Sequence, residues 1–449
     1  MIIPWLAPLL ACGHAPAPRP DVEDTQAPAD SGCPNGSGAD VWSASAAEGQ
    51  LSGWDFSWSG VGFAGDLSGD GDREIVAWGT TYGDTTQEVV RLYEASSFAS
   101  SPSGEAAWTM SVPDPGAENS YLVSVGAEGD LTGDGATDLV LGATTDELIV
   151  TSGPLESAPL SSDAFLRVTG DGLGRSQALA GDLDGDGVPD LAAGMFSAVV
   201  LISPVVLAGE LDVADAGPRL SFRGERSGFV PEVAAGGDQD GDGLADLLVS
   251  TWSWSGVFLG PIPSGVEDSA EATFDGDGAR GRRTGASGDF DGDGYPDIVV
   301  GAPESDHGSS LGGSAWVVRG PVHGSVDLAN AEAHIPGDGD LLNLGSAVAS
   351  AGDADGDGAD ELLVSADAAD CRGNSATSCV SRPARVYRFH GPVSGTLEPS
   401  CADVTWDGEN YTGDRFGKTV YAARDVDGSG RPDMVVSTEE LSAYLFIDP

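Results

Sequence analysis

The chain has 449 residues, of which 66 are Gly and 27 are Pro, and its formal net charge is −52 at pH 7. So many turn-forming residues argue against long helices, and so strong a negative charge excludes nucleic acid as a partner because the chain would repel phosphates. Hydrophobic residues make up 40% of the chain, which suffices for a packed core.

The first 40 residues predict an export signal and a tether. Residues 1–11 are apolar and uncharged, and the run Leu9-Leu10-Ala11-Cys12 resembles a bacterial lipoprotein cleavage box, in which Cys12 becomes the acylated first residue. An ordinary cleaved signal peptide is the alternative. Residues 12–40 form a linker rich in Pro and Ala. We therefore expect a lipid anchor as the one membrane attachment, at the outer membrane or cell surface, with a periplasmic or secreted protein as alternatives.

Residues 41–449 contain seven repeats of one pattern, an acidic loop of the form Asp-x-Asp-Gly-Asp-Gly-x-x-Asp followed by an apolar run. The separations between successive loops range from 51 to 72 residues. Each repeat accommodates four strands, which in the sixth are residues 346–350, 362–366, 384–389 and 401–406, and Gly-Pro pairs punctuate the strands. Four strands per repeat predict an all-β, seven-bladed β-propeller with four-stranded blades.

Ring closure requires one more strand, because the last repeat has room for three. Residues 41–47 precede the first repeat at the spacing that outer strands show elsewhere. We predict that they supply the outer strand of the seventh blade, since an open ring would expose bare sheet edges.

The seven loops have the ligand chemistry of a calcium site. Carboxylates occupy positions 1, 3, 5 and 9, position 7 offers a backbone carbonyl, and Gly at positions 4 and 6 permits the tight turn. Hard oxygen ligands in a flexible loop favour Ca²⁺ over Mg²⁺, and up to seven structural ions are expected. An EF-hand is excluded because position 12 is apolar and strands follow the loops. An Asx-rich turn without metal is the alternative.

The predicted ligand residues, loop by loop, are Asp66, Ser68, Asp70, Asp72 and Glu74; Asp130, Thr132, Asp134, Ala136 and Asp138; Asp182, Asp184, Asp186, Val188 and Asp190; Asp238, Asp240, Asp242, Leu244 and Asp246; Asp289, Asp291, Asp293, Tyr295 and Asp297; Asp353, Asp355, Asp357, Ala359 and Glu361; and Asp425, Asp427, Ser429, Arg431 and Asp433. The second and seventh loops have three carboxylates each, so we expect them to bind more weakly.

Four cysteines remain after acylation of Cys12, and an exported protein can oxidise them. Cys371 and Cys379 share one polar loop, which predicts a local bridge. Cys401 falls on the predicted outer strand of the sixth blade and Cys33 precedes the predicted closing strand. A Cys33–Cys401 bridge would therefore pin the N-terminus across the seam of the ring, with a free Cys33 as the alternative.

These patterns resemble the FG-GAP repeats of the integrin α-chain propeller. Phe416-Gly417 supplies the FG, Gly301-Ala302-Pro303 supplies a GAP, and the acidic loop lies between such landmarks. The resemblance covers roughly residues 41–449. It implies structural Ca²⁺ sites on one face of the ring and ligands engaged on the other face or between blades.

Two enzyme-like patterns lack the flanking elements that catalysis or cofactor binding would require. Residues 308–312 match Gly-x-Ser-x-Gly but lie in a Gly/Ser-rich loop, and residues 60–65 match a dinucleotide fingerprint but run into the first acidic loop without a helix. The five histidines show no metal-ligand spacing, and the pairs Trp54/Trp58 and Trp252/Trp254 are expected to pack rather than bind sugars. We therefore expect a calcium-stabilised, non-enzymatic binding or adhesion module for an unknown protein or glycan. A lectin-like propeller or a polysaccharide-acting enzyme is the alternative.

Overall fold

A computed structural model describes residues 40–446 of the chain except residues 45–46, 48, 53–55, 72, 82–86, 95–107, 112–121, 144–145, 156–163, 204–206, 223–228, 252–253, 263–269, 277–282, 307–310, 340–341, 368–383, 409–414, 426–428 and 439–441. No helix within these residues is long and apolar enough to cross a lipid bilayer. The predictions for Cys12, Cys33, Cys371, Cys379, Asp72 and Asp427 lie outside the described residues.

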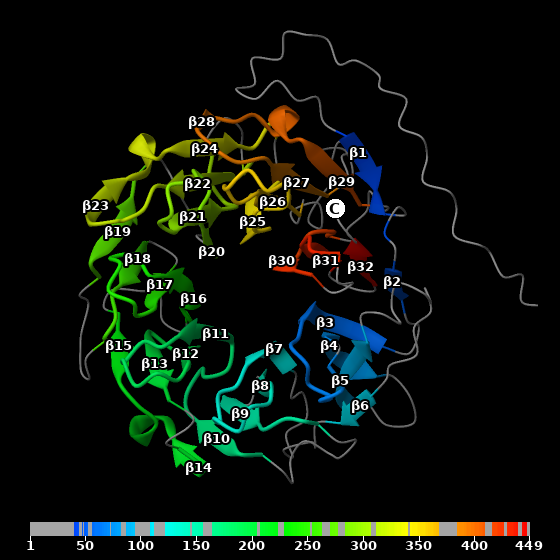
Figure 1. Cartoon of the computed structure of the whole chain (residues 1–449), viewed down its shortest axis with the longest axis vertical. Coiled ribbons are helices and arrows are strands. Elements are labelled where there is room, and N and C mark those ends of the chain that lie inside the picture. The colour runs from blue at the N-terminus through cyan, green and yellow to red at the C-terminus, as the bar shows by residue number, and fades with distance from the viewer. Residues whose placement is uncertain are drawn as a thin grey trace, which may run out of the picture.

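Seven sheets surround a central axis, and each is one blade of a β-propeller (Figure 1). The first strands of successive blades contact one another around the axis. The main strands of the blades are β3 (Phe56–Phe63), β4 (Glu74–Thr81), β5 (Gln87–Glu94) and β6 (Trp108–Ser111); β7 (Leu122–Gly129), β8 (Asp138–Ala143), β9 (Glu147–Thr151) and β10 (Leu166–Thr169); β11 (Ser176–Gly181), β12 (Asp190–Met195), β13 (Ala198–Ile202) and β15 (Arg219–Ser221); β16 (Glu232–Gly237), β17 (Asp246–Ser250), β18 (Ser255–Phe258) and β19 (Ala272–Asp275); β20 (Arg283–Gly288), β21 (Asp297–Ala302), β22 (Ser314–Val318) and β24 (Ala333–Pro336); β25 (Leu344–Ser350), β26 (Leu362–Ala366), β27 (Arg385–Phe389) and β29 (Val404–Asp407); and β30 (Val420–Arg424), β31 (Asp433–Ser437), β32 (Ser442–Phe446) and β2 (Gly49–Ser52).

The core consists of seven hydrophobic clusters, one between each pair of neighbouring blades. The second strands β8, β12, β17, β21, β26 and β31 are buried at every residue. Strands that are covered on both faces are expected to consist of continuous apolar residues. The sequence that follows each loop has this character. Because each blade buries its faces against its neighbours, the ring is one packed unit.

Four blades carry a fifth strand, so the prediction of four-stranded blades holds for three of the seven. A short segment that precedes the fourth strand of one blade runs parallel to the outer strand of the preceding blade. Such a segment covers an edge that would otherwise expose unpaired backbone groups. These added strands are β14 (Gly209–Asp212) on β10, β23 (Gly324–Asp327) on β19, β28 (Gly395–Thr396) on β24 and β1 (Asp40–Ser43) on β29. The short 3-10 helices Val213–Asp215, Leu328–Asn330 and Pro399–Cys401 follow β14, β23 and β28.

An N-terminal strand closes the ring, as predicted, but it is a different one. Within residues 41–47, β1 pairs in parallel with β29 of the sixth blade. The closing strand is β2, which pairs antiparallel with β32 of the seventh blade (Figure 1). The difference arises because the chain covers the edge of one blade before it enters the next. Val61, Ile75, Val435 and Leu445 then pack together across the seam.

The sequence landmarks lie where neighbouring blades touch. A Cβ on Gly301 of β21 would lie 2.3 Å from the carbonyl oxygen of Gly345, which opens the next blade. Gly345 has a φ of +85°, which disfavours residues with a Cβ. Gly142 and Gly174 make the same contact between the second and third blades. Glycine at the GAP and FG positions therefore lets successive blades approach closely.

Candidate metal-binding loops

All seven acidic loops connect the first strand of a blade to its second strand, so they lie on one face of the ring. In the fifth loop Gly292 and Gly294 have φ values of +75° and +88°. At position 6 of every loop, a Cβ would meet no atom within 4 Å. Glycine is therefore required there by backbone conformation and not by crowding.

The carboxylate at position 1 organises the backbone of each loop. In the fourth loop Asp238 accepts hydrogen bonds from the N–H groups of Gly241, Asp242 and Gly243 at 2.8, 3.1 and 2.9 Å. Every other loop repeats at least two of these three bonds. An Asx-type turn explains these bonds without a metal, so position 1 alone does not decide between the two predictions.

Position 9 gives the stronger argument for a cation. The acidic residue at this position is 0–2% exposed in all seven loops. In the fourth and fifth loops, burial raises the pKa of Asp246 to about 6 and that of Asp297 to about 7, despite hydrogen bonds from Gly260 and Gly320 that oppose the shift. Burial likewise raises the pKa of Glu74, Asp138, Asp190 and Glu361. A buried carboxylate needs either a proton or a nearby cation.

Five loops bring three ligand atoms within 4.8 Å of one another. The groups are Asp66, Asp70 and Glu74; Asp182, Asp184 and Asp190; Asp238, Asp240 and Asp242; Asp289, Asp291 and Asp297; and Asp355, Asp357 and His390. Within the described residues, the second and seventh loops form no such group. The seventh loop is described only in part, because its predicted ligand Asp427 lies outside the described residues.

The remaining predicted ligands take other contacts. Thr132 at position 3 of the second loop donates to Asp138, and Ser68 of the first loop donates to Asp66. At position 7, the N–H groups of Ala136, Val188, Leu244, Tyr295 and Ala359 donate to the position 5 carboxylate of their own loop. In the seventh loop, the N–H of Arg431 donates to Ser429.

The loops also join neighbouring blades. The carbonyl oxygen of Asp182 accepts the N–H of Ala245 in the next loop at 3.0 Å, and Asp289 accepts that of Asp360 at 2.7 Å. An ion that fixes one loop would therefore also stabilise the junction with the next blade.

One position next to the loops was missed in the sequence, namely the residue that directly follows the third strand in the second to sixth blades. In the second to sixth blades this residue is Ser152, Ser203, Leu259, Arg319 or His390. Ser152 and Ser203 donate to carboxylates of their own loops. The signal that could have identified it is the fixed place of this residue one or two positions before a Pro.

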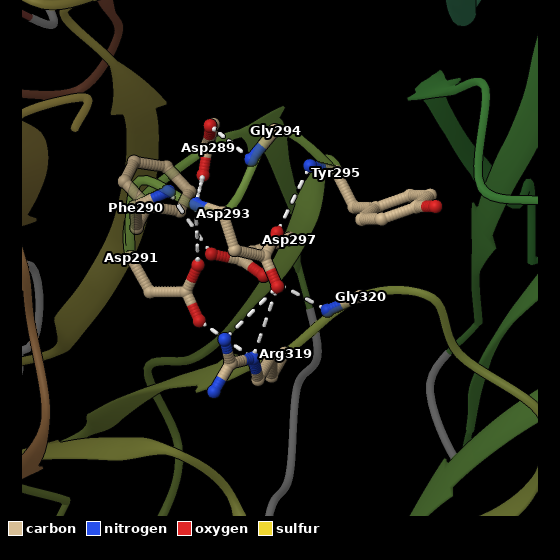
Figure 2. Close-up of polar contacts among 9 residues, drawn as sticks. All are labelled: Asp289, Phe290, Asp291, Asp293, Gly294, Tyr295, Asp297, Arg319 and Gly320. Atoms are coloured by element: carbon tan, nitrogen blue, oxygen red, sulfur yellow. Dashed lines mark hydrogen bonds and ion pairs between the residues drawn. The ribbon is translucent and has the colours of Figure 1, made fainter. Parts of the chain in front are cut away.

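Arg319 places a guanidinium in the fifth loop. Its Nε lies 2.7 Å from Asp291 Oδ2 and its Nη2 lies 2.9 Å from Asp293 Oδ2, as Figure 2 shows. A backbone hydrogen bond from Tyr295, and then Arg319, lower the pKa of Asp293. This arginine neutralises part of the negative charge of the loop.

His390 occupies the same position in the sixth loop. Its Nε2 lies 3.1 Å from Asp355 Oδ2 and its Nδ1 lies 3.2 Å from Glu361 Oε1. The five histidines show no metal-ligand spacing in the sequence, yet the fold brings His390 close to Asp355 and Asp357, which lie more than 30 residues before it.

The enzyme-like and sugar-binding patterns gain no support. Residues 60–65 are followed by the first acidic loop and then by β4, and no helix lies among the described residues of this segment. Trp254 packs against Phe222 and Phe258, with ring centroids 5.4 and 6.4 Å apart. Residues 307–310, Trp54 and Trp252 lie outside the described residues.

One of the seven repeats matches a known family. The FG-GAP repeat family matches residues 282–318, which contain the fifth loop. The comparison with curated proteins finds no match. Among solved structures, BBS1N in complex with ARL6DN, soaked with lead, is 11% identical, with a TM-score of 0.46 over 87% of this chain and 91% of that chain. Chaetomium thermophilum Raptor is 9% identical, with a TM-score of 0.48 over 89% of this chain and 28% of that chain. The protein is thus a seven-bladed β-propeller in which residues 282–318 match the FG-GAP repeat family.

Proposed function

We propose that this protein is a non-enzymatic binding module whose ring is stabilised by Ca²⁺ in the acidic loops. The observation that carries the proposal is the gathering of three potential ligand atoms in each of five loops on one face. Four of these groups offer oxygen alone, which suits Ca²⁺.

An unsatisfied buried oxygen supports a cation in the first loop. Glu74 Oε1 is buried and accepts no hydrogen bond from the described residues. Buried polar atoms are normally satisfied, so such atoms indicate a missing partner.

The placement of the basic side chains favours binding over catalysis. In the described residues, Arg167, Arg319, Arg385, Arg388 and Arg415 each pair with a carboxylate. A polysaccharide-acting enzyme would need basic side chains directed at an acidic substrate. With its loops holding structural ions, the ring would present its other face, or the surface between blades, to a protein or glycan ligand.

The proposed setting is the outside of the cell, with the chain tethered through Cys12 and the linker. Outside the cell, loops of moderate affinity would stay occupied by Ca²⁺, because extracellular calcium modules function at about 10⁻⁴–10⁻³ M Ca²⁺.

A glycan array and a cell-surface binding assay test the function, each with the full chain in Ca²⁺ and after removal of metal. We expect Ca²⁺-dependent binding without release of products from any bound polysaccharide. Binding that is equal in both conditions contradicts the role of the ion, and cleavage of a glycan contradicts the non-enzymatic assignment.

A further inference from the structure

The sixth loop differs from the other described loops because it contains an imidazole. His390 follows β27 and lies over the loop, and one atom each from Asp355, Asp357 and His390 lies within 4.8 Å of the others. The His390 side chain is 36% exposed, so an ion can reach this group from solvent.

A buried carboxylate holds this imidazole in place. Glu361 is 1% exposed, and its Oε2 accepts the N–H of Ala354 at 2.6 Å. Its Oε1 has no hydrogen bond within the described residues, yet it lies 3.2 Å from His390 Nδ1. Metal-binding histidines commonly direct their second nitrogen at a carboxylate in this way, which fixes the ring orientation. Nε2 is thereby directed toward the loop.

The donor set at this loop suits a transition metal, and the separation between the ligand atoms is compatible with one. Bonds of about 2.0–2.1 Å in a tetrahedral zinc site place neighbouring ligand atoms about 3.3 Å apart. His390 Nε2 and Asp355 Oδ2 are 3.1 Å apart. A neutral imidazole nitrogen favours Zn²⁺ and its neighbours in the first transition row, whereas Ca²⁺ takes six to eight oxygen ligands at longer distances.

We infer that the sixth loop is a transition-metal site of the zinc class, formed by Asp355, Asp357 and His390 and oriented by Glu361. Three protein ligands leave a fourth position for water or for a group from a partner. The inference goes beyond the proposed calcium role and does not depend on the other loops.

The full chain is stripped of metal, loaded with Zn²⁺ in excess Ca²⁺ and passed through a desalting column before metal analysis. His390→Ser introduces the residue found at this position in the second and third blades, so the fold should tolerate it. His323→Ser is the control, because His323 faces Glu271 and no acidic loop. We expect one retained Zn²⁺ per chain in the parent and in the control, and none in His390→Ser.

Two further measurements separate the site from a general effect on folding. Glu361→Gln should weaken Zn²⁺ binding about 10–100-fold, as loss of an orienting carboxylate does elsewhere. Cobalt substitution should give a visible absorption band that His390→Ser lacks. If the parent retains no Zn²⁺, or if folded His390→Ser retains as much as the parent, the assignment is wrong.

Discussion

Removal of metal should destabilise the ring more strongly at neutral pH than at acid pH. The reason lies in the buried carboxylates at position 9 of the loops. Without metal, burial raises the pKa of Asp297 from 3.8 to about 7 and that of Asp246 from 3.8 to about 6. Each of these groups then carries a proton in the folded state at a pH where the unfolded chain has lost it.

The sign and size of the effect follow from these values. Because the folded pKa exceeds the unfolded one, stability is fully present below about pH 4 and is lost as the pH rises through 6 to 7. At about 1.4 kcal/mol for each pKa unit, ionisation costs about 4 kcal/mol at Asp297 and about 3 kcal/mol at Asp246. A bound Ca²⁺ would replace the proton and remove this cost.

Thermal melts of metal-stripped protein at about pH 5 and pH 7.5, with and without CaCl₂, measure the effect. For a chain of this size, 1 kcal/mol corresponds to roughly 1 °C in Tm. The two groups therefore predict that the gap between the Tm with CaCl₂ and the Tm without it is several degrees wider at the higher pH. MgCl₂ at equal concentration is the control and should stabilise less. An unchanged Tm on adding CaCl₂ at pH 7.5, or a larger gap at pH 5, would refute the reasoning.

Three further predictions address single positions, and a fourth addresses a disulfide. Asp240→Ala should remove one Ca²⁺ per chain and leave the fold intact; calorimetry that finds unchanged stoichiometry contradicts the ligand assignment. Arg319→Leu should tighten Ca²⁺ binding in the fifth loop by a few-fold, because it removes a competing cation; an unchanged affinity would show that the guanidinium does not compete. Cys12→Ser should release the protein from the membrane fraction, and continued sedimentation with membranes would exclude the lipid anchor. Peptide mapping without reductant should find Cys33 joined to Cys401; a Cys33 peptide that alkylates freely would exclude that bridge.

Much of the fold could be predicted because its signals are local. The Asp-Gly spacing fixes the turn through position 1, where a carboxylate accepts backbone bonds within five residues. The apolar runs after the loops become fully buried second strands, and residues 362–366 of the prediction coincide with β26. The repeat count therefore determined the number of blades.

Tertiary structure decided what depends on distant residues. β1 adds to the sixth blade and β2 closes the seventh, a choice set by which sheet edge is uncovered and not by the strand sequence. Burial raises the pKa of Asp297, and the opposing hydrogen bond comes from Gly320, 23 residues away, so the surroundings of this carboxylate depend on residues outside its own loop. Arg319 and His390 reach the loops of their own blades because the third strand returns beside the second. The sequence by itself thus determined the acidic loops and the seven-bladed ring, whereas packing of distant segments decided the surroundings of each loop and therefore which cation each loop suits.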